Sequence, residues 1–394
     1  MLKPLLLTAA SVLPTFAAAK SPADVLLLAG GSLPLCSSIN RDACIGEAPL
    51  GRRSAPETLE TDARGARLLE TVNFAASRDS DAKAIYLHFV TMAQAAHLKR
   101  SGKPIKRPLI GIITASAQDP FDPVDFYLAA FSQAGADPLW LPLDGAVREA
   151  WSSGSKDLPR LRESLTGADD RSELYPDLAE FQRQFLLDRA QLASMIAEFD
   201  GLFFNGGDQM LTKAAWFDGA QPIPELALLK ARVSAGTLAI GGTSAGTAVM
   251  GTAPMITNGE SVTALKRGAK AQAPPPLDCA ELGTCPPGLR EDDLTYEPSG
   301  GLGLFPLGIL DTHFDARDRQ GRLAKLLLDS GTRYGFGVDE TTALLLAPTA
   351  NGYRLRALGA GEVWIFDAKK HSDAADLAGK ARRLKPNEDL QWPR

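Results

Sequence analysis

The chain has 394 residues, of which 45% are hydrophobic and 23% are charged, a balance typical of a globular protein with a buried core. Its formal net charge is −5 and it has no basic tract, which argues against a nucleic-acid partner. The sequence contains no motif of a metal or cofactor site, so none is expected.

The first residues have the pattern of a secretory signal peptide. One lysine precedes an apolar run, and the small residues Ala17 and Ala19 stand before Lys20. Cleavage after Ala19 is therefore expected. The apolar run is short for a membrane anchor and Pro14 interrupts it, so no membrane attachment is expected. The sequence predicts a secreted or periplasmic protein.

Four cysteines follow the predicted cleavage point, in two close pairs. Cys36 and Cys44 form one pair, and Cys279 and Cys285 form the other. In an oxidising compartment such pairs predict two local disulfides. A zinc site is the alternative, and the spacing of the cysteines disfavours it.

Apolar runs that end in glycines alternate with amphipathic stretches along the chain. This alternation predicts an α/β fold in which helices flank a mainly parallel sheet. Strands are expected in 23–31, 108–116, 138–143, 201–207, 237–242, 335–340 and 342–347, and helices in 81–99, 124–134, 177–198, 223–235 and 318–329.

Three segments differ from this pattern and are predicted to be insertions in a single domain that spans 20–394. They are 36–80, 149–175 and 265–300, which are polar or rich in proline. The last of them lies between two of the motifs described below, so we expect it to border the functional site.

The stretch Gly242-Thr243-Ser244-Ala245-Gly246 fits the pattern G-x-S-x-G. This pattern is typical of a sharp strand-to-helix turn that exposes a nucleophilic serine, although a small-residue turn that opens an ordinary helix would look the same. If Ser244 is a nucleophile, the Ala245 N–H is the natural first oxyanion donor. Gly206, Gly207 and Asp208, at a neighbouring strand end, could supply a second donor, and Gly207 is the candidate among them, although glycines there can also serve tight packing alone.

A serine nucleophile needs a base, and the chain has only four histidines. His88 and His97 fall in an amphipathic helix, and His371 falls in a polar run. His313 directly follows an apolar strand, as Ser244 does, and is therefore the predicted base.

The acid that would orient the histidine is less easily chosen. Asp339 and Glu340 both follow a predicted strand, and composition leaves the choice between them open. In either case the acid follows His313 in the chain. In the α/β-hydrolases the acid precedes the histidine, so the chain order argues against that fold.

Four motifs in order resemble the cyanophycinase family of serine peptidases, which is related to the aspartyl dipeptidases. They are "FFNGGDQ", "GGTSAGTAVMGTAPMITNGES", "LDTHFDARDRQGRLAKLL" and "GFGVDETTAL", and the similarity spans roughly residues 107–367 without the insertions at 149–175 and 265–300. The resemblance implies a flavodoxin-type fold like that of class I glutamine amidotransferases. It also implies that Ser244 is the nucleophile, His313 the general base and Glu340, rather than Asp339, the orienting acid.

The resemblance further nominates residues of a substrate pocket, which are Gln209, Asp311, Thr312, Arg317, Arg319 and Arg322. The arginines would form a clamp for carboxylates, although a solvated helix face with an Asp318–Arg322 pair is the plain alternative. The family commonly has glutamine at position 312, where this chain has threonine.

The function predicted from the sequence is hydrolysis of cyanophycin, an aspartate polymer with arginine on each side chain, to β-Asp-Arg dipeptides. A related aspartyl dipeptidase that acts on short peptides is one alternative. A catalytically silent binding protein on the same fold is the other. The expected partner is a polypeptide substrate, and whether the chain forms a homodimer is left open.

Overall fold

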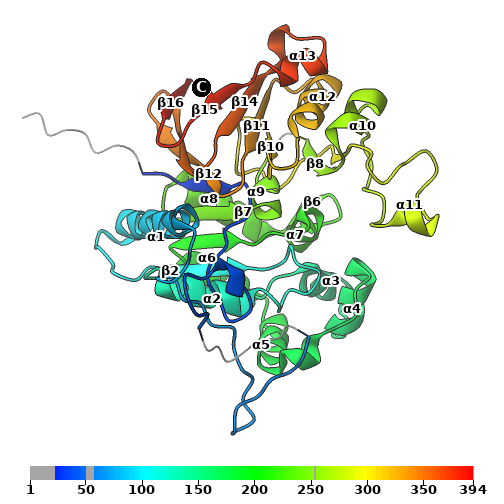
Figure 1. The fold of residues 1–394 in the computed structure, drawn as a ribbon. Coiled ribbons are helices and arrows are strands. Elements are labelled where there is room, and N and C mark those ends of the chain that lie inside the picture. Colours follow the sequence, from blue (N-terminus) through cyan, green and yellow to red (C-terminus); the bar gives the residue numbers. More distant parts are fainter. Residues whose placement is uncertain (1–22, 50–56, 253, 394) are drawn as a thin grey trace, which may run out of the picture.

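An eight-stranded sheet forms the centre of the structure, a computed structural model that describes residues 23–49, 57–252 and 254–393 (Figure 1). Its strands lie in the order β16-β13-β12-β1-β7-β4-β2-β3. They are β1 (Leu26–Ala29), β2 (Leu109–Ile113), β3 (Asp137–Trp140), β4 (Gly201–Phe204), β7 (Ala239–Thr243), β12 (Thr342–Thr349), β13 (Gly352–Gly359) and β16 (Asp389–Pro393).

The strands from β1 to β3 in this order all pair in parallel. The predicted mainly parallel sheet flanked by helices is thereby confirmed. The other side of β1 differs, because β12, β13 and β16 extend the sheet by antiparallel pairing. The hairpin between β12 and β13 was not expected from the sequence.

A second sheet of four strands stands beside the first. Its order is β10 (Ile309–Asp311), β11 (Tyr334–Val338), β14 (Val363–Asp367) and β15 (Arg382–Leu384). Only β10 and β11 are parallel. The strand predicted in 335–340 therefore exists, but it belongs to this second sheet. Helix α12 (Gln320–Ser330) packs its buried leucines against β10 and β11.

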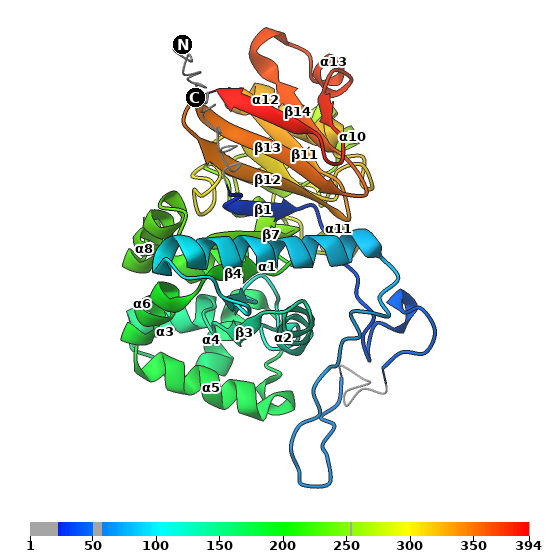
Figure 2. The same ribbon diagram turned by 90° about the vertical axis from the view of Figure 1, so that its left-hand side faces the viewer.

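Helices cover both faces of the large sheet because its strands are apolar on both sides. Leu26 and Leu28 face one core, while Leu27 between them faces another. Helix α1 (Ser80–Ser101) crosses the Leu27 side in Figure 2, with α2 (Val124–Gln133) beside it. Helices α3 (Gly145–Ser153), α6 (Ala190–Glu198) and α8 (Pro224–Ser234) contribute to the other core.

Two helical predictions need correction. The helix predicted in 177–198 is broken into α5 (Pro176–Leu187) and α6, because Asp188 has non-helical backbone angles and its carboxylate accepts the Ala190 N–H at 3.1 Å. The segment 149–175, predicted to be an inserted loop, contains helix α4 (Leu158–Thr166). Asp157 caps this helix by accepting the Arg160 N–H.

The remaining elements are short. They are η1 (Arg41–Ala43), η2 (Ser172–Leu174), α7 (Gln209–Trp216), β5 (Phe217–Asp218), β6 (Gln221–Pro222), α9 (Ala245–Ala248), β8 (Met255–Asn258), α10 (Ser261–Arg267), α11 (Cys279–Leu282), β9 (Thr295–Glu297), η3 (Ala368–Lys370) and α13 (Ala374–Ala378).

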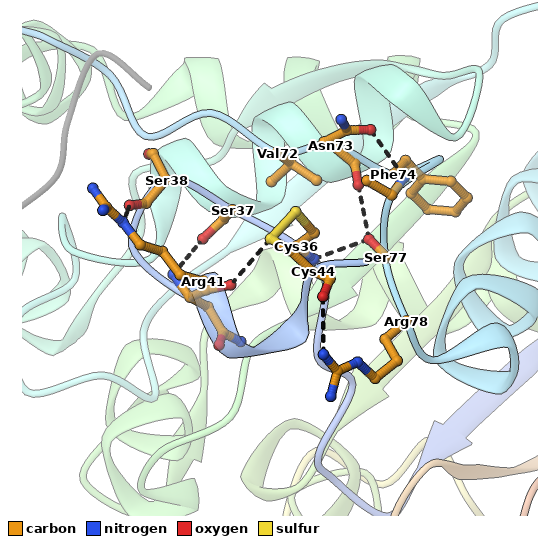
Figure 3. The surroundings of a disulfide bond; sticks show 12 residues. Cys36, Ser37, Ser38, Arg41, Cys44, Val72, Asn73, Phe74, Ser77 and Arg78 are labelled. Atoms are coloured by element: carbon orange, nitrogen blue, oxygen red, sulfur yellow. Dashed lines mark hydrogen bonds between the residues drawn. A yellow bond between two sulfur atoms is a disulfide. The ribbon is translucent and has the colours of Figure 1, made fainter. Parts of the chain in front are cut away.

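The cysteines are joined in the two pairs expected from the sequence. The Cα atoms are 4.4 Å apart in Cys36–Cys44 and 4.7 Å apart in Cys279–Cys285. Figure 3 shows how the first disulfide holds the start of the 36–80 insertion, where the Ser77 hydroxyl accepts the Cys36 N–H at 2.9 Å. The predicted signal peptide lies outside the described residues. Among the residues that are described, no helix combines the length and apolar character that a membrane crossing needs.

Candidate active site

Ser244 lies in the sharp turn between β7 and α9. Its backbone has φ 53° and ψ −116°, a strained conformation for a residue with a side chain. The flanking glycines are required for space, because a Cβ on Gly242 would collide with the Gly246 carbonyl, and one on Gly246 with the Phe204 carbonyl. The Thr247 hydroxyl donates to the Gly242 carbonyl at 2.9 Å and fixes the turn. The G-x-S-x-G pattern thus forms a tight turn that holds the serine side chain at the strand end.

His313 meets this serine from the end of β10. Its Nε2 lies 2.8 Å from the Ser244 Oγ. The backbone N–H of His313 donates to the Gly30 carbonyl at 2.7 Å, and the φ of His313 is 47°. Gly31 packs so closely against the imidazole that a Cβ there would collide with the ring. The loop after β1 therefore holds the histidine in place.

Sequence reasoning did not assign this role to Gly30 and Gly31. The signal was present, because two glycines directly follow an apolar strand in "LLAGGSL". Gly31 has φ 120°, which side chains rarely adopt. What the sequence does not show is that the loop lies against a residue almost 300 positions later.

Glu340 lies against the other ring nitrogen of the histidine. Its Oε1 is 2.6 Å from the His313 Nδ1. The neighbouring Asp339 points elsewhere and accepts three hydrogen bonds, from the Trp364 Nε1 at 3.0 Å, the Asp315 N–H at 3.1 Å and the Glu362 N–H at 2.9 Å. The geometry thus gives the two acids separate partners.

The electrostatics around His313 favour its neutral form. Burial lowers the pKa of the imidazole, and the positive charges of Arg317 and Arg319 lower it further, while the hydrogen bond to Glu340 opposes both effects. A neutral imidazole next to a hydroxyl can accept its proton, so this environment suits a general base.

The two predicted oxyanion donors come from two neighbouring strand ends. Ala245 begins α9, and Gly207 follows β4 with φ 139°. Within the described parts of the chain, neither N–H donates a hydrogen bond. Gly206 lies nearer to the serine, since a Cβ on it would be 3.4 Å from the Ser244 Cβ.

Two of the predicted pocket residues are paired with each other. Asp311 and Arg322 are 2% and 5% exposed, and they form a bidentate ion pair with distances of 2.8 and 2.6 Å. A third bond joins the Arg322 guanidinium to the Gly259 carbonyl at 2.6 Å. Arg322 and Asp311 therefore satisfy each other, although Arg322 also lines the larger of the two cavities described below together with Arg317 and Arg319, so the clamp of three arginines stays a prediction.

Arg319 and Arg317 are more accessible. Arg319 donates to the Thr312 carbonyl at 2.8 Å, and burial lowers its pKa to about 10. Arg317 is exposed. Thr312 itself is buried, and the Gln209 amide donates to the Ile256 carbonyl at 2.7 Å.

Two cavities adjoin this constellation. One, of about 1060 Å³, is lined by Arg317 and Arg319 and by residues of the 265–300 insertion, including Leu277 and Arg290. The insertion expected to border the site thus lines the arginine-rich cavity. The other, of about 580 Å³, contains Ser244 and His313 and extends toward α2.

Part of this chain is similar in sequence to curated proteins. It is 32% identical over 144 residues to a cyanophycinase from Trichormus variabilis, a match that covers 36% of this chain and 38% of that protein. It is 30% identical over 149 residues to a cyanophycinase from Geminocystis herdmanii, covering 38% and 44%. The chain thus matches about two fifths of the length of these curated relatives.

No family model matches the chain. Among solved structures, a peptidase from an acI-B1 Actinobacterium superposes with a TM-score of 0.44 at 13% identity, covering 79% of this chain and 93% of that one. The resemblance to cyanophycinases that the motifs indicated is confirmed over part of the chain by the curated relatives.

Proposed function

We propose that the protein is a serine peptidase in which Ser244 is the nucleophile, His313 the general base and Glu340 the group that orients the base. One observation carries the proposal. The hydroxyl, the imidazole and the carboxylate are connected by contacts of 2.8 and 2.6 Å at the ends of neighbouring elements. This order of groups is what a serine nucleophile requires.

The reaction follows from the positions of these groups. As the Ser244 Oγ attacks the carbonyl carbon of the scissile amide, the His313 Nε2 takes the hydroxyl proton. The negative charge that develops on the carbonyl oxygen is stabilised by the N–H groups of Ala245 and Gly207. The C–N bond then breaks, and His313 returns the proton to the leaving amine. A water then attacks the acyl carbon while His313 accepts one of its protons. The bond between the acyl carbon and the Ser244 Oγ breaks, His313 returns the proton to this oxygen, and the carboxylic acid product leaves.

Throughout these steps Glu340 keeps the Nδ1–H of the imidazole directed toward itself. The Nε2 therefore remains the basic nitrogen that faces the serine. The carboxylate also stabilises the imidazolium that forms after proton transfer.

We propose cyanophycin as the substrate and β-Asp-Arg dipeptides as the product. The similarity to cyanophycinases over part of the chain supports this substrate class. Arg317 and Arg319, which line the larger cavity, supply cations for the substrate's carboxylates. The disulfides and the predicted signal peptide support action outside the cytoplasm.

The test is to incubate the purified mature chain with insoluble cyanophycin and to identify the soluble products by mass. Release of β-Asp-Arg by the parent protein and none by Ser244→Ala is the expected result. If the parent leaves cyanophycin intact but cleaves short aspartyl peptides in a Ser244-dependent way, the chain is the dipeptidase alternative. Threonine at position 312, buried where the family commonly has glutamine, is the feature that favours this second candidate.

The binding-protein alternative is tested by a fluorophosphonate, which labels only an activated serine. Labelling of the parent protein and not of Ser244→Ala supports an enzyme. A parent protein that stays unlabelled would support a silent binding protein.

A further inference from the structure

The cavity of about 580 Å³ has an acidic wall formed by aspartate side chains. Ser244 and His313 belong to the lining of the same cavity. Among the residues that the structure describes, the other charged side chains in its lining are the carboxylates of Asp119, Asp122 and Asp169 and one guanidinium, that of Arg171. With a neutral histidine, these described residues carry an excess of negative charge.

One of these carboxylates is strongly desolvated. The side chain of Asp119 is only 13% exposed, and its Oδ1 accepts the Phe121 N–H at 3.0 Å. Its Oδ2 is buried and has no hydrogen-bond partner among the described residues. The nearest cation is Arg171 at 3.6 Å, which is also 3.4 Å from Glu57. A buried carboxylate oxygen without a hydrogen bond is costly, and a donor from a ligand would relieve that cost.

Part of the wall comes from a segment that the resemblance to cyanophycinases does not cover. Asp169 and Arg171 belong to the 149–175 insertion. Arg67, from the 36–80 insertion, bridges Asp125 at the start of α2 and Asp177 at the start of α5.

Arg67 is also connected to a residue of the cavity lining. The Arg67 guanidinium lies 5.3 Å from the centre of the Tyr175 ring, and the Tyr175 hydroxyl donates to the Asp122 Oδ1 at 2.7 Å. The acidic wall is therefore held in a fixed position relative to the serine.

The lining also includes aromatic rings. Phe126 and Tyr127, both from α2, contribute to the cavity. A guanidinium is planar, stacks on aromatic faces and donates up to five hydrogen bonds, whereas an ammonium is a compact and strongly hydrated charge. Carboxylates beside aromatic rings therefore match a guanidinium better than an ammonium.

We propose that this cavity binds a guanidinium side chain of the substrate next to the scissile bond, with Asp119 and Asp169 as its carboxylate partners. The inference rests on the proposed peptidase function, because Ser244 and His313, the proposed nucleophile and base, belong to the lining of this cavity. It goes beyond that function by assigning charge selectivity to the acidic wall and its insertions.

The test compares two β-aspartyl peptides that differ only in charge, one with arginine and one with its neutral isostere citrulline. The parent protein should prefer the arginine peptide in kcat/KM. In the double variant Asp119→Asn/Asp169→Asn this preference should fall by about tenfold or more, since charge-assisted hydrogen bonds are lost.

The double variant should remain folded. After Asp119→Asn, the amide oxygen of the new side chain can still accept the Phe121 N–H. Asp169 is exposed, so its replacement removes no buried group from the fold.

A matched control is Glu163→Gln, which removes an exposed carboxylate of α4 that does not line the cavity. It should keep the arginine preference of the parent. A lysine peptide should be cleaved less efficiently than the arginine peptide by the parent protein.

Calorimetric titration with arginine amide and citrulline amide provides a readout that does not need turnover. The parent should bind arginine amide more tightly, and the double variant should lose that difference. If the parent shows no turnover but the binding difference appears and is lost as expected, the proposed peptidase function fails while the guanidinium site stands. An arginine preference that is the same in the parent and in the double variant, in both assays, would overturn the inference.

Discussion

Exchanging the acids at positions 339 and 340 one at a time tests the proposed active site most sharply. The two residues are neighbours in the chain, yet Glu340 contacts His313 while Asp339 accepts bonds from the Trp364 side chain and two backbone N–H groups. Glu340→Gln should therefore lower activity, and Asp339→Asn should lower stability.

The size of the first effect follows from the contact of 2.6 Å between Glu340 and His313. A glutamine oxygen can accept the same N–H, but the bond then loses its charge assistance, which is worth about 1–2 kcal/mol, or roughly 5- to 30-fold in kcat. If the amide instead turns its NH₂ toward the ring, it stabilises the wrong tautomer, and losses up to about 10⁴-fold are known for that case. The Glu340 side chain is 35% exposed, so solvent screens its charge and we expect a loss of roughly 5- to 30-fold rather than the larger value.

Asp339→Asn should lower the stability of the fold rather than the activity. The new NH₂ would face the Glu362 N–H, so that one hydrogen bond is replaced by two opposed donors, at a cost of about 1–3 kcal/mol. The assays are kcat for β-Asp-Arg release and thermal unfolding. If Asp339→Asn lost more activity than Glu340→Gln while its Tm stayed at the parent value, the assignment of Glu340 would be wrong.

Three further predictions address the nucleophile, the base and the disulfides. Ser244→Ala should lower turnover by on the order of 10³-fold or more and keep the Tm, because alanine retains the Cβ that the strained turn already accommodates; residual activity near the parent level would contradict a serine mechanism. Because burial and Arg317 lower the pKa of His313, the neutral base persists below pH 6.5, so kcat/KM should fall only at more acidic pH. Arg317→Gln removes a positive charge and should move that acidic midpoint upward; a midpoint that stays in place would show that Arg317 does not act on the base. Peptide mapping without reduction should recover Cys36 linked to Cys44, whose joint replacement by serine should cost about 2–3 kcal/mol, and free thiols there would contradict an oxidising compartment.

Local patterns in the sequence were sufficient to locate the main elements and to single out Ser244 and His313, which lie 2.8 Å apart in the structure and whose catalytic roles stay proposals. Runs of apolar residues that end in glycines mark parallel strands, because such strands are buried on both faces. Ser244 and His313 both follow strands of this kind, and the carboxyl ends of strands are where α/β proteins gather their reactive groups. That the chain forms one domain, and that its first 19 residues are a cleaved signal peptide, stay predictions.

Which acid contacts the histidine, and how the arginines pair, became visible only in the tertiary structure. Asp339 and Glu340 have the same chemistry and follow the same strand, so composition does not distinguish them. The family resemblance selected Glu340, and the structure shows Glu340 in contact with His313. Spacing on α12 likewise puts Arg319 and Arg322 on one face, but it does not show that Asp311 takes the second arginine into the interior.

The sequence also did not show where the inserted segments pack. Their polar composition marks 36–80 and 149–175 as departures from the regular alternation, but composition does not say where they pack. In the structure, Arg67 of the first segment bonds to α2 and α5 more than 50 residues away, and residues of the second line the cavity that contains Ser244. Contacts over such separations depend on how the whole chain folds, because no local periodicity encodes which distant side chain a charged group will meet.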